Sequence, residues 1–230
     1  MPRQNLPHNG IERENMNHPF EYTTGCLSAP ETADLQPSFH TLTPSAYKDG
    51  AYRLRRYSKF RYRQSDGCIE LQANSQFVQG DELNRFQGNV ARTYDDLTAD
   101  TIASAGFAAM FRRFAETAGL PEPAEIEVHQ MRIIAKSAGQ AAESTPEGIH
   151  QDGFDRIGVF TVARHNAEGG ELYLWRNPDD AAPLAACLPQ AGDFCVLNDS
   201  LLWHSASPVN TRSDAEAGYW DLFVLTANRS

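Results

Sequence analysis

Ile157-Gly158-Val159-Phe160-Thr161-Val162-Ala163 is rich in β-branched and aromatic residues, a composition that predicts a β-strand. The chain keeps this character from Glu127 to its end, and no helical pattern interrupts it. Further short strands are expected over 128–134, around His150, over 171–175, 183–187 and 192–197, around His204, and over 222–226. A hairpin turn at Glu168-Gly169-Gly170 is expected to lead into the strand at 171. About eight such strands predict a mainly β fold with flanking helices, built on a double-stranded β-helix, the cupin-like jelly-roll barrel.

The N-terminal part of the chain is expected to flank this barrel. Residues 1–35 are polar and punctuated by proline, asparagine and glycine, and they predict an irregular arm with room for a short strand. Residues 36–230 are long enough for one domain with a sizeable core. We expect a single jelly-roll domain there, in which a strand and helix subregion over 36–125 precedes the barrel core over 126–230.

Two local patterns stand out in that subregion. Arginines alternate with aromatic residues over Tyr52–Arg63, which predicts a strand, and a returning strand is expected over 68–71. Apolar residues recur at helical spacing over 99–118. Thr98 can cap the start of this helix, and Gly119 can end it.

Composition and charge narrow the class of protein. The chain has 230 residues, of which 41% are hydrophobic and 22% charged, values that are ordinary for a globular protein. A net charge of -10 argues against a nucleic-acid partner, which favours a basic face. The four cysteines form neither a CxxC pair nor a disulfide framework, and no apolar stretch indicates a signal peptide or a membrane span. These features predict a cytoplasmic protein; oligomeric state is left open.

The segment Pro146-Glu147-Gly148-Ile149-His150-Gln151-Asp152-Gly153 carries the first chemical signal. On a strand, His150 and Asp152 share one face and can bind one ion. His204, near the start of a late strand, can supply a third ligand. Two histidines and one carboxylate occupy one face of an octahedral iron and leave the other positions open. The pattern predicts that His150, Asp152 and His204 are metal ligands at a catalytic centre.

Other histidines compete for the third position. His165 lies beside a turn, where capping or solvent exposure is expected. His129 fits a core or surface position of its own strand. The remaining three histidines precede the barrel: His8, His18 and His40.

Seven short motifs, in order, resemble one family. They are Arg55–Phe60, Asn89–Arg92, His129–Arg132, Ile149–Gly153, Gly169–Glu171, Asn198–Asp199 before His204, and Asp221–Thr226. From about Tyr52 to Thr226 the chain resembles the bacterial iron and 2-oxoglutarate dioxygenases that include L-isoleucine 4-hydroxylase and related free amino-acid hydroxylases. The resemblance implies a jelly roll, Fe(II), 2-oxoglutarate and O2, with ascorbate as the reductant in vitro. It also implies hydroxylation of an unactivated C–H bond in an aliphatic or cyclic free L-amino acid, with release of succinate and carbon dioxide.

One position departs from that family. An arginine that binds the distal carboxylate of 2-oxoglutarate is expected directly before Asp221, but Trp220 stands there. Tryptophan offers one N–H, whereas a carboxylate is best held by a guanidinium. Arg212 and then Arg132 are the expected substitutes, with Gln130 beside them. Either arginine has a structural alternative, as a solvated turn residue or as an ion-pair partner.

The arginine-rich strand supplies candidates for the substrate's carboxylate. Arg55, Arg56 and Tyr57 are expected to cross the mouth of the barrel, with Arg92 nearby. The alternative is that alternating cations mark only a solvated face of this strand.

Two other functions stay open from the residues alone. A cupin-like metal protein that is not an oxygenase is one, although cupin sites usually use a His-x-His pair. An oxygenase of a peptide-bound or carrier-bound amino acid is the other.

Overall fold

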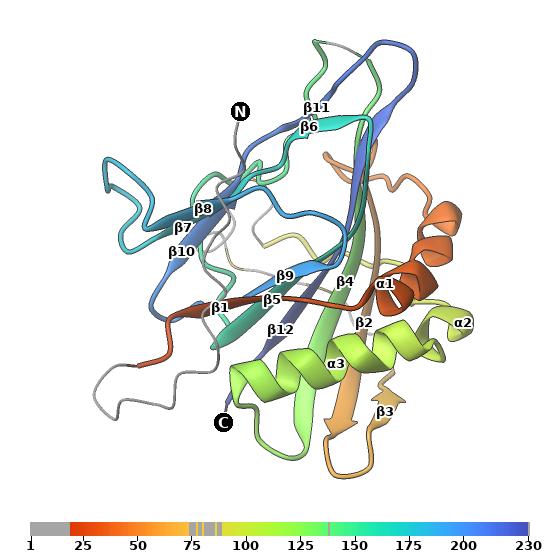
Figure 1. The fold of residues 1–230 in the computed structure, drawn as a ribbon, viewed down its shortest axis with the longest axis vertical. Helices are drawn as coiled ribbons and strands as arrows, with labels where there is room; N and C mark the ends of the chain where they lie inside the picture. Colours follow the sequence, from red (N-terminus) through yellow and green to blue (C-terminus); the bar gives the residue numbers. More distant parts are fainter. Residues whose placement is uncertain are drawn as a thin grey trace.

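The computed structural model describes residues 19–229, except 74–76, 78, 79, 81–85, 87, 88 and 138. A large antiparallel sheet dominates it (Figure 1). In spatial order its strands are β1 (Tyr22–Cys26), β9 (Asp193–Asn198), β5 (Arg156–His165), β12 (Gly218–Ala227), β4 (Ala124–Ala135), β2 (Arg53–Arg63) and β3 (Cys68–Leu71). The mainly β fold predicted from the sequence is confirmed.

Two smaller sheets complete the β structure. One contains β10 (Trp203–Ala206), β7 (Leu172–Trp175) and β8 (Ala185–Cys187), and the other pairs β11 (Val209–Thr211) with β6 (Ala167–Gly169). The helical elements are α1 (Ala29–Leu35), the 3-10 helix η1 (Gln36–Thr41), α2 (Ala99–Ile102) and α3 (Ala105–Ala118). Within the described part of the chain, no helix is long and apolar enough to cross a bilayer.

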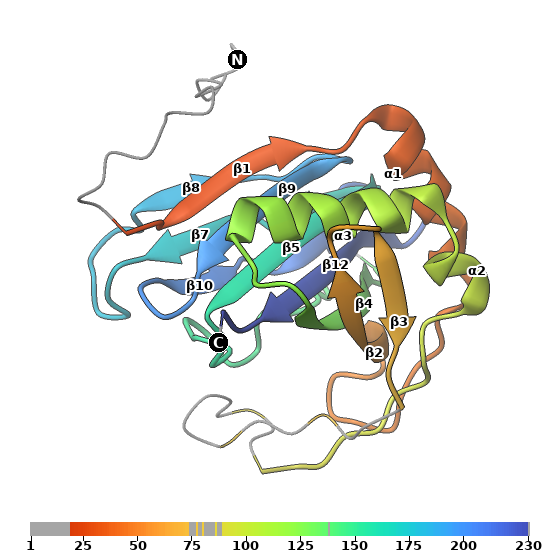
Figure 2. The same cartoon turned by 90° about the horizontal axis from the view of Figure 1, so that it is seen from below.

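Alternation along β12 divides the core in two. Phe223 and Leu225 pack in the same apolar cluster as the phenylalanines of α3, which crosses one face of the large sheet (Figure 2). Trp220 and Leu222 point to the opposite face and pack with residues of β7, such as Leu174. Successive residues of a strand face opposite sides, so this second face of the sheet is the one that meets the small sheets.

The predicted helix over 99–118 is interrupted. Thr98 caps α2 as expected, but Ser104 accepts a hydrogen bond from the backbone N–H of Phe107 and starts α3 as a separate helix. A serine that bonds to backbone in this way favours an N-cap over a helix interior. Gly119 ends α3 in the left-handed conformation, as the sequence predicted.

Three other expectations differ from the structure. The arm expected over 1–35 contains a short strand, β1, for which it left room, but also the capped helix α1, which was not expected; residues 1–18 lie outside the described part. The expected strand around His150 is a single bridge to His204. The expected hairpin at 168–170 instead connects β6 and β7, which belong to different sheets, through two glycines of positive φ.

Candidate metal centre

The structure brings the three predicted ligands together. Nε2 of His150 lies 3.6 Å from Oδ1 of Asp152, and Nε2 of His204 lies 3.5 Å from Oδ2 of the same carboxylate. One ligand atom from each residue lies within 4.8 Å of the others. Two imidazoles and one carboxylate at this spacing fit the facial triad of a non-haem iron.

Backbone contacts set the position of each ligand. His150 and His204 exchange two backbone hydrogen bonds of 3.0 and 2.9 Å, so both rings leave neighbouring backbone positions. Nδ1 of His150 lies 3.0 Å from the carbonyl oxygen of Gly148. A proton on Nδ1 satisfies that oxygen and leaves the lone pair of Nε2 for a metal.

Asp199 connects the two halves of this triad. Its Oδ2 accepts hydrogen bonds from the backbone N–H groups of Asp152 and Gly153, at 2.8 and 2.9 Å, and a longer one from Phe154. Its Oδ1 faces Nδ1 of His204 at 3.4 Å. One buried carboxylate thus fixes the turn that carries Asp152 and lies beside the ring of His204. The sequence placed Asp199 in a family motif but gave it no role.

The electrostatics of the triad favour a cation. Burial alone raises the pKa of Asp152, but the hydrogen bond from His204 and the charges of His150 and His204 hold that pKa well below its usual range. Burial alone lowers the pKa of His204, but its contacts with Asp152 and Asp199 raise it to about 10. Without a metal, a proton on His204 therefore balances the carboxylate, and a bound metal ion takes that proton's place.

A cavity opens beside the triad. Its polar lining includes three arginines, Arg53, Arg55 and Arg92, together with Glu147 and His129. Its apolar lining includes Met131, Ile133, Val159, Leu172, Trp220, Leu222 and Val224. A cavity with this mixed lining suits a small polar molecule with an apolar part.

Two of the four predicted substrate residues line this cavity. Arg55 is buried there, and its guanidinium carbon lies 5.3 Å from the centre of the Tyr94 ring. Arg92 is buried beside the ring of Phe77. These two arginines therefore do not lie on a solvated face, which was the alternative explanation for the alternating cations.

Arg56 and Tyr57 are not among the residues that line the cavity. Arg56 donates to the backbone oxygens of Asp96 and Thr41 at 2.9 and 3.1 Å. Tyr57 donates to the carboxylate of Glu127. Arg56 follows Arg55 directly on β2, so its side chain leaves the opposite face of the strand.

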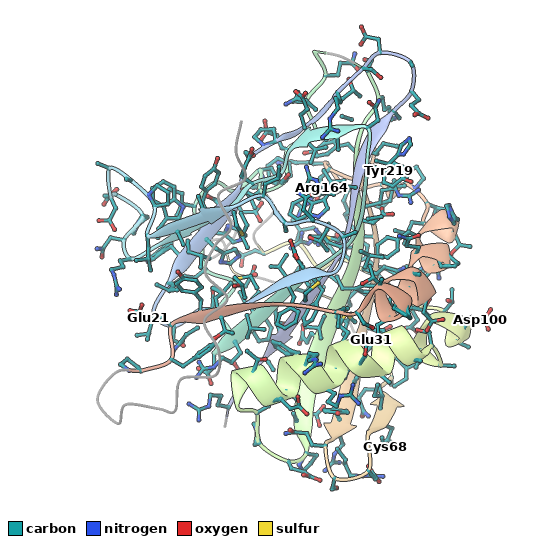
Figure 3. The ribbon with its side chains drawn as sticks, in the orientation of Figure 1. Glu21, Glu31, Cys68, Asp100, Arg164 and Tyr219 are labelled. Carbon is teal, nitrogen blue, oxygen red and sulfur yellow. The ribbon has the colours of Figure 1, made fainter. Side chains whose placement is uncertain are left out.

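The residues expected to hold the cosubstrate also lie elsewhere. Arg132 forms a bidentate salt bridge with Asp221, at 2.6 and 2.7 Å, and stacks on Tyr219, which Figure 3 labels. Arg132 is therefore an ion-pair partner, the structural alternative expected for it, and it lies on the face of β4 that points away from the cavity. Gln130 shares that face and donates to Ser38. Arg212 is exposed and contacts the backbone oxygen of Ala167 at 3.4 Å.

Trp220 cannot replace the expected arginine. Its indole is buried against the cavity, and its N–H donates to the hydroxyl of Thr161 at 3.0 Å. That donor is therefore already used, and the neighbouring lining residues Ile133 and Leu222 are apolar. A carboxylate at this end of the cavity has to be bound by a side chain that reaches in from another strand.

Arg53 and Glu147 are charged cavity residues to which the sequence pattern assigned no role. Arg53 precedes Arg55 by two positions, so strand alternation alone places both on one face. Glu147 lies three residues before His150, inside the segment that carried the metal signal. Nothing in the sequence indicates that its side chain turns toward the same cavity.

Comparisons with known proteins agree with this geometry. The model of the family described as 2OG-Fe dioxygenase matches residues 36–226. A search of curated proteins found no match. A solved bsmA homologue from Methylobium petroleophilum PM1 is 27% identical with a TM-score of 0.73, over 87% of this chain and 82% of its own.

Two more distant structures share the fold. IDO from Bacillus thuringiensis is 16% identical with a TM-score of 0.70, over 87% of this chain and 86% of its own. TqaL, described as an Fe(II)/(alpha)ketoglutarate-dependent dioxygenase, is 13% identical with a TM-score of 0.62, over 88% and 75%.

Proposed function

Because this chain belongs to the 2OG-Fe dioxygenase family, we propose that it hydroxylates an unactivated C–H bond of a free L-amino acid, aliphatic or cyclic. The family implies Fe(II) and 2-oxoglutarate, and the His-Asp-His cluster fits the metal. In the proposed reaction, the amino acid, O2 and 2-oxoglutarate give the hydroxylated amino acid, succinate and carbon dioxide. A cupin-like protein without oxygenase activity, one of the alternatives from the sequence, is not what the family match supports.

The proposed ligands of the iron are His150, Asp152 and His204. Bound iron and cosubstrate supply the oxidising chemistry, and the protein supplies position and a dry environment. Asp199 supports these ligands. One of its oxygens accepts a hydrogen bond from the backbone N–H of Asp152, and the other faces Nδ1 of His204.

The observation that carries the substrate class is the setting of Arg55. Its guanidinium is buried in the cavity, and Asp49, an acidic residue whose charge acts on it, is hydrogen-bonded to Arg53. Burial, together with the nearby charge of Arg53, lowers the pKa of Arg55. A buried guanidinium is costly unless it is paired. A carboxylate on a small substrate satisfies it, and Arg92 lines the same cavity.

For the distal carboxylate of 2-oxoglutarate, we assign Arg53. Arg53 on β2 and Trp220 on β12 both pair with Ile133 of β4, the strand between them, so Arg53 reaches in at the level where the family's arginine is expected. Asp49 holds one of its nitrogens at 3.0 Å, and its buried Nε has no hydrogen-bond acceptor. A ligand carboxylate supplies that missing acceptor.

A mass-spectrometric screen tests the function. The protein is incubated with Fe(II), 2-oxoglutarate, ascorbate and the standard and cyclic amino acids, and a product heavier by one oxygen is sought together with succinate. His150→Ala and Asp152→Ala are expected to abolish both products. Unchanged masses across all free amino acids, with an active iron centre, would move the substrate to peptide-bound or carrier-bound amino acids.

A further inference from the structure

Glu147 is a buried carboxylate in the cavity that the proposed roles leave unused. Its side chain is 9% exposed, and Oε1 lies 3.3 Å from Nε2 of His150, the nitrogen that faces the metal position. Oε2 is buried and accepts no hydrogen bond. Nη1 of Arg53 lies 4.0 Å from this Oε2, beyond hydrogen-bond distance.

This carboxylate is poorly satisfied by the protein itself. An ionised carboxylate can accept about four hydrogen bonds, and burying one without partners is costly. Arg53 is held more closely by Asp49, at 3.0 Å, than by Glu147. The cavity therefore presents a carboxylate that needs a hydrogen-bond donor, and the described residues do not provide one at Oε2.

We propose that Glu147 binds the ammonium group of the substrate and thereby selects α-amino acids over acids that lack the amine. This inference rests on the proposed function. An ammonium group at Glu147 satisfies the open carboxylate, while Arg55, which lines the same cavity, binds the substrate's carboxylate. The pair recognises both charges of a zwitterion.

The position of Glu147 also determines which carbon is presented. Because Oε1 lies beside the metal-facing nitrogen of His150, an ammonium there keeps the α-carbon close to the triad. The apolar wall of Val159, Leu222 and Val224 then receives the side chain. Carbons near the start of that side chain are the ones held within reach of the metal.

Two other roles make different predictions. Glu147 as a further metal ligand predicts that its loss removes iron, although it is not part of the ligand cluster. Glu147 as a purely structural partner of Arg53 predicts weaker 2-oxoglutarate binding and no change in substrate preference.

The test compares Glu147→Gln with wild type and with Glu143→Gln, an exposed glutamate four positions earlier in the same loop. Iron content and the Kd of 2-oxoglutarate are measured without oxygen. The Kd of the amino acid that wild type hydroxylates is then measured by calorimetry on the anaerobic Fe(II)–2-oxoglutarate complex. The same is done for the matching α-hydroxy acid, in which a hydroxyl replaces the amine.

Glu147→Gln is expected to bind the amino acid about 10-fold to 100-fold more weakly, the scale of a lost hydrogen bond to a charged group. Its preference for the amino acid over the hydroxy acid is expected to collapse, while iron and 2-oxoglutarate binding stay within about twofold of wild type. Glu147→Asp keeps the charge and is expected to retain part of the preference. Glu143→Gln is expected to match wild type.

Each contrary result overturns a distinct statement. Loss of iron from Glu147→Gln, or a wild-type preference in both Glu147 variants, overturns the inference alone. A wild-type protein that binds and hydroxylates no free amino acid overturns the proposed function, and the inference with it.

Discussion

Replacing Asp199 by asparagine separates its role as an acceptor from its role as an anion. In wild type, the backbone N–H groups of Asp152 and Gly153 lie 2.8 and 2.9 Å from Oδ2 of Asp199, and the asparagine oxygen can still accept these hydrogen bonds. Its amide N–H2 then faces Nδ1 of His204, where Oδ1 lies at 3.4 Å. Two donors cannot share this contact, so His204 is expected to carry its proton on Nε2, the nitrogen needed by the metal.

The magnitude follows from these contacts. Outer partners of metal ligands typically contribute 10-fold to 100-fold in metal affinity, or about 1.4 to 2.7 kcal/mol. We expect Asp199→Asn to weaken Fe(II) binding by that range and to lower turnover at limiting iron in proportion. Asp199→Ala also leaves the two close backbone donors without an acceptor, which costs a further ~1 to 3 kcal/mol each.

Chelator competition gives the metal affinity, and thermal unfolding of the metal-free protein gives the stability. Asp180→Asn is the matched control, because Asp180 accepts a backbone hydrogen bond from Asn177 in an exposed turn. We expect that control to match wild type in iron binding. An Asp199→Asn protein that binds iron within twofold of wild type would refute the tautomer argument.

Three further predictions concern other residues. Arg53→Gln is expected to raise the Kd of 2-oxoglutarate about 10-fold or more, measured anaerobically by calorimetry; an unchanged Kd removes the assignment. Arg132→Met leaves the buried carboxylate of Asp221 without its partner, and we expect about 3 kcal/mol less stability in denaturant titrations with no change in the Kd of 2-oxoglutarate. Burial, then the charge of Arg55, holds the pKa of His129 well below 6.5, so the unfolded chain takes up a proton that the folded protein does not as pH falls below about 6.5. Wild type should lose up to about 1.4 kcal/mol of stability per pH unit more than His129→Phe, and parallel curves for the two proteins would contradict this.

Much of the fold could be predicted from the composition of the strands and from the residues that cap or end the helices. The runs around Ile157 and over Tyr52–Arg63 became β5 and β2, because their side chains suit a pleated, half-buried surface. The break between α2 and α3 was not predicted, because the apolar spacing continues through it. The side chain of Ser104 bonds to the backbone as an N-cap there, in competition with a continuous helix.

The metal cluster was predictable for a local reason. His150 and Asp152 are two residues apart, and an imidazole and a carboxylate at that spacing can bind one metal ion. The expected strand was wrong, since His150 has only one bridge and the turn beyond it depends on Asp199. The sequence could not show this, because the hydrogen bonds that shape the turn come from a residue 47 positions away.

By itself, the amino-acid sequence determined the β-rich character of this protein and the types of side chain that can bind a metal. Only the tertiary structure decided which charges share the cavity. Strand pairing directs Arg53 and Arg55 inward and ties Arg132 to Asp221 on the other face. It also brings Glu147 to His150 and the indole of Trp220 to Thr161. Residue type and spacing are local properties, whereas the partner of a buried charge depends on which strands become neighbours.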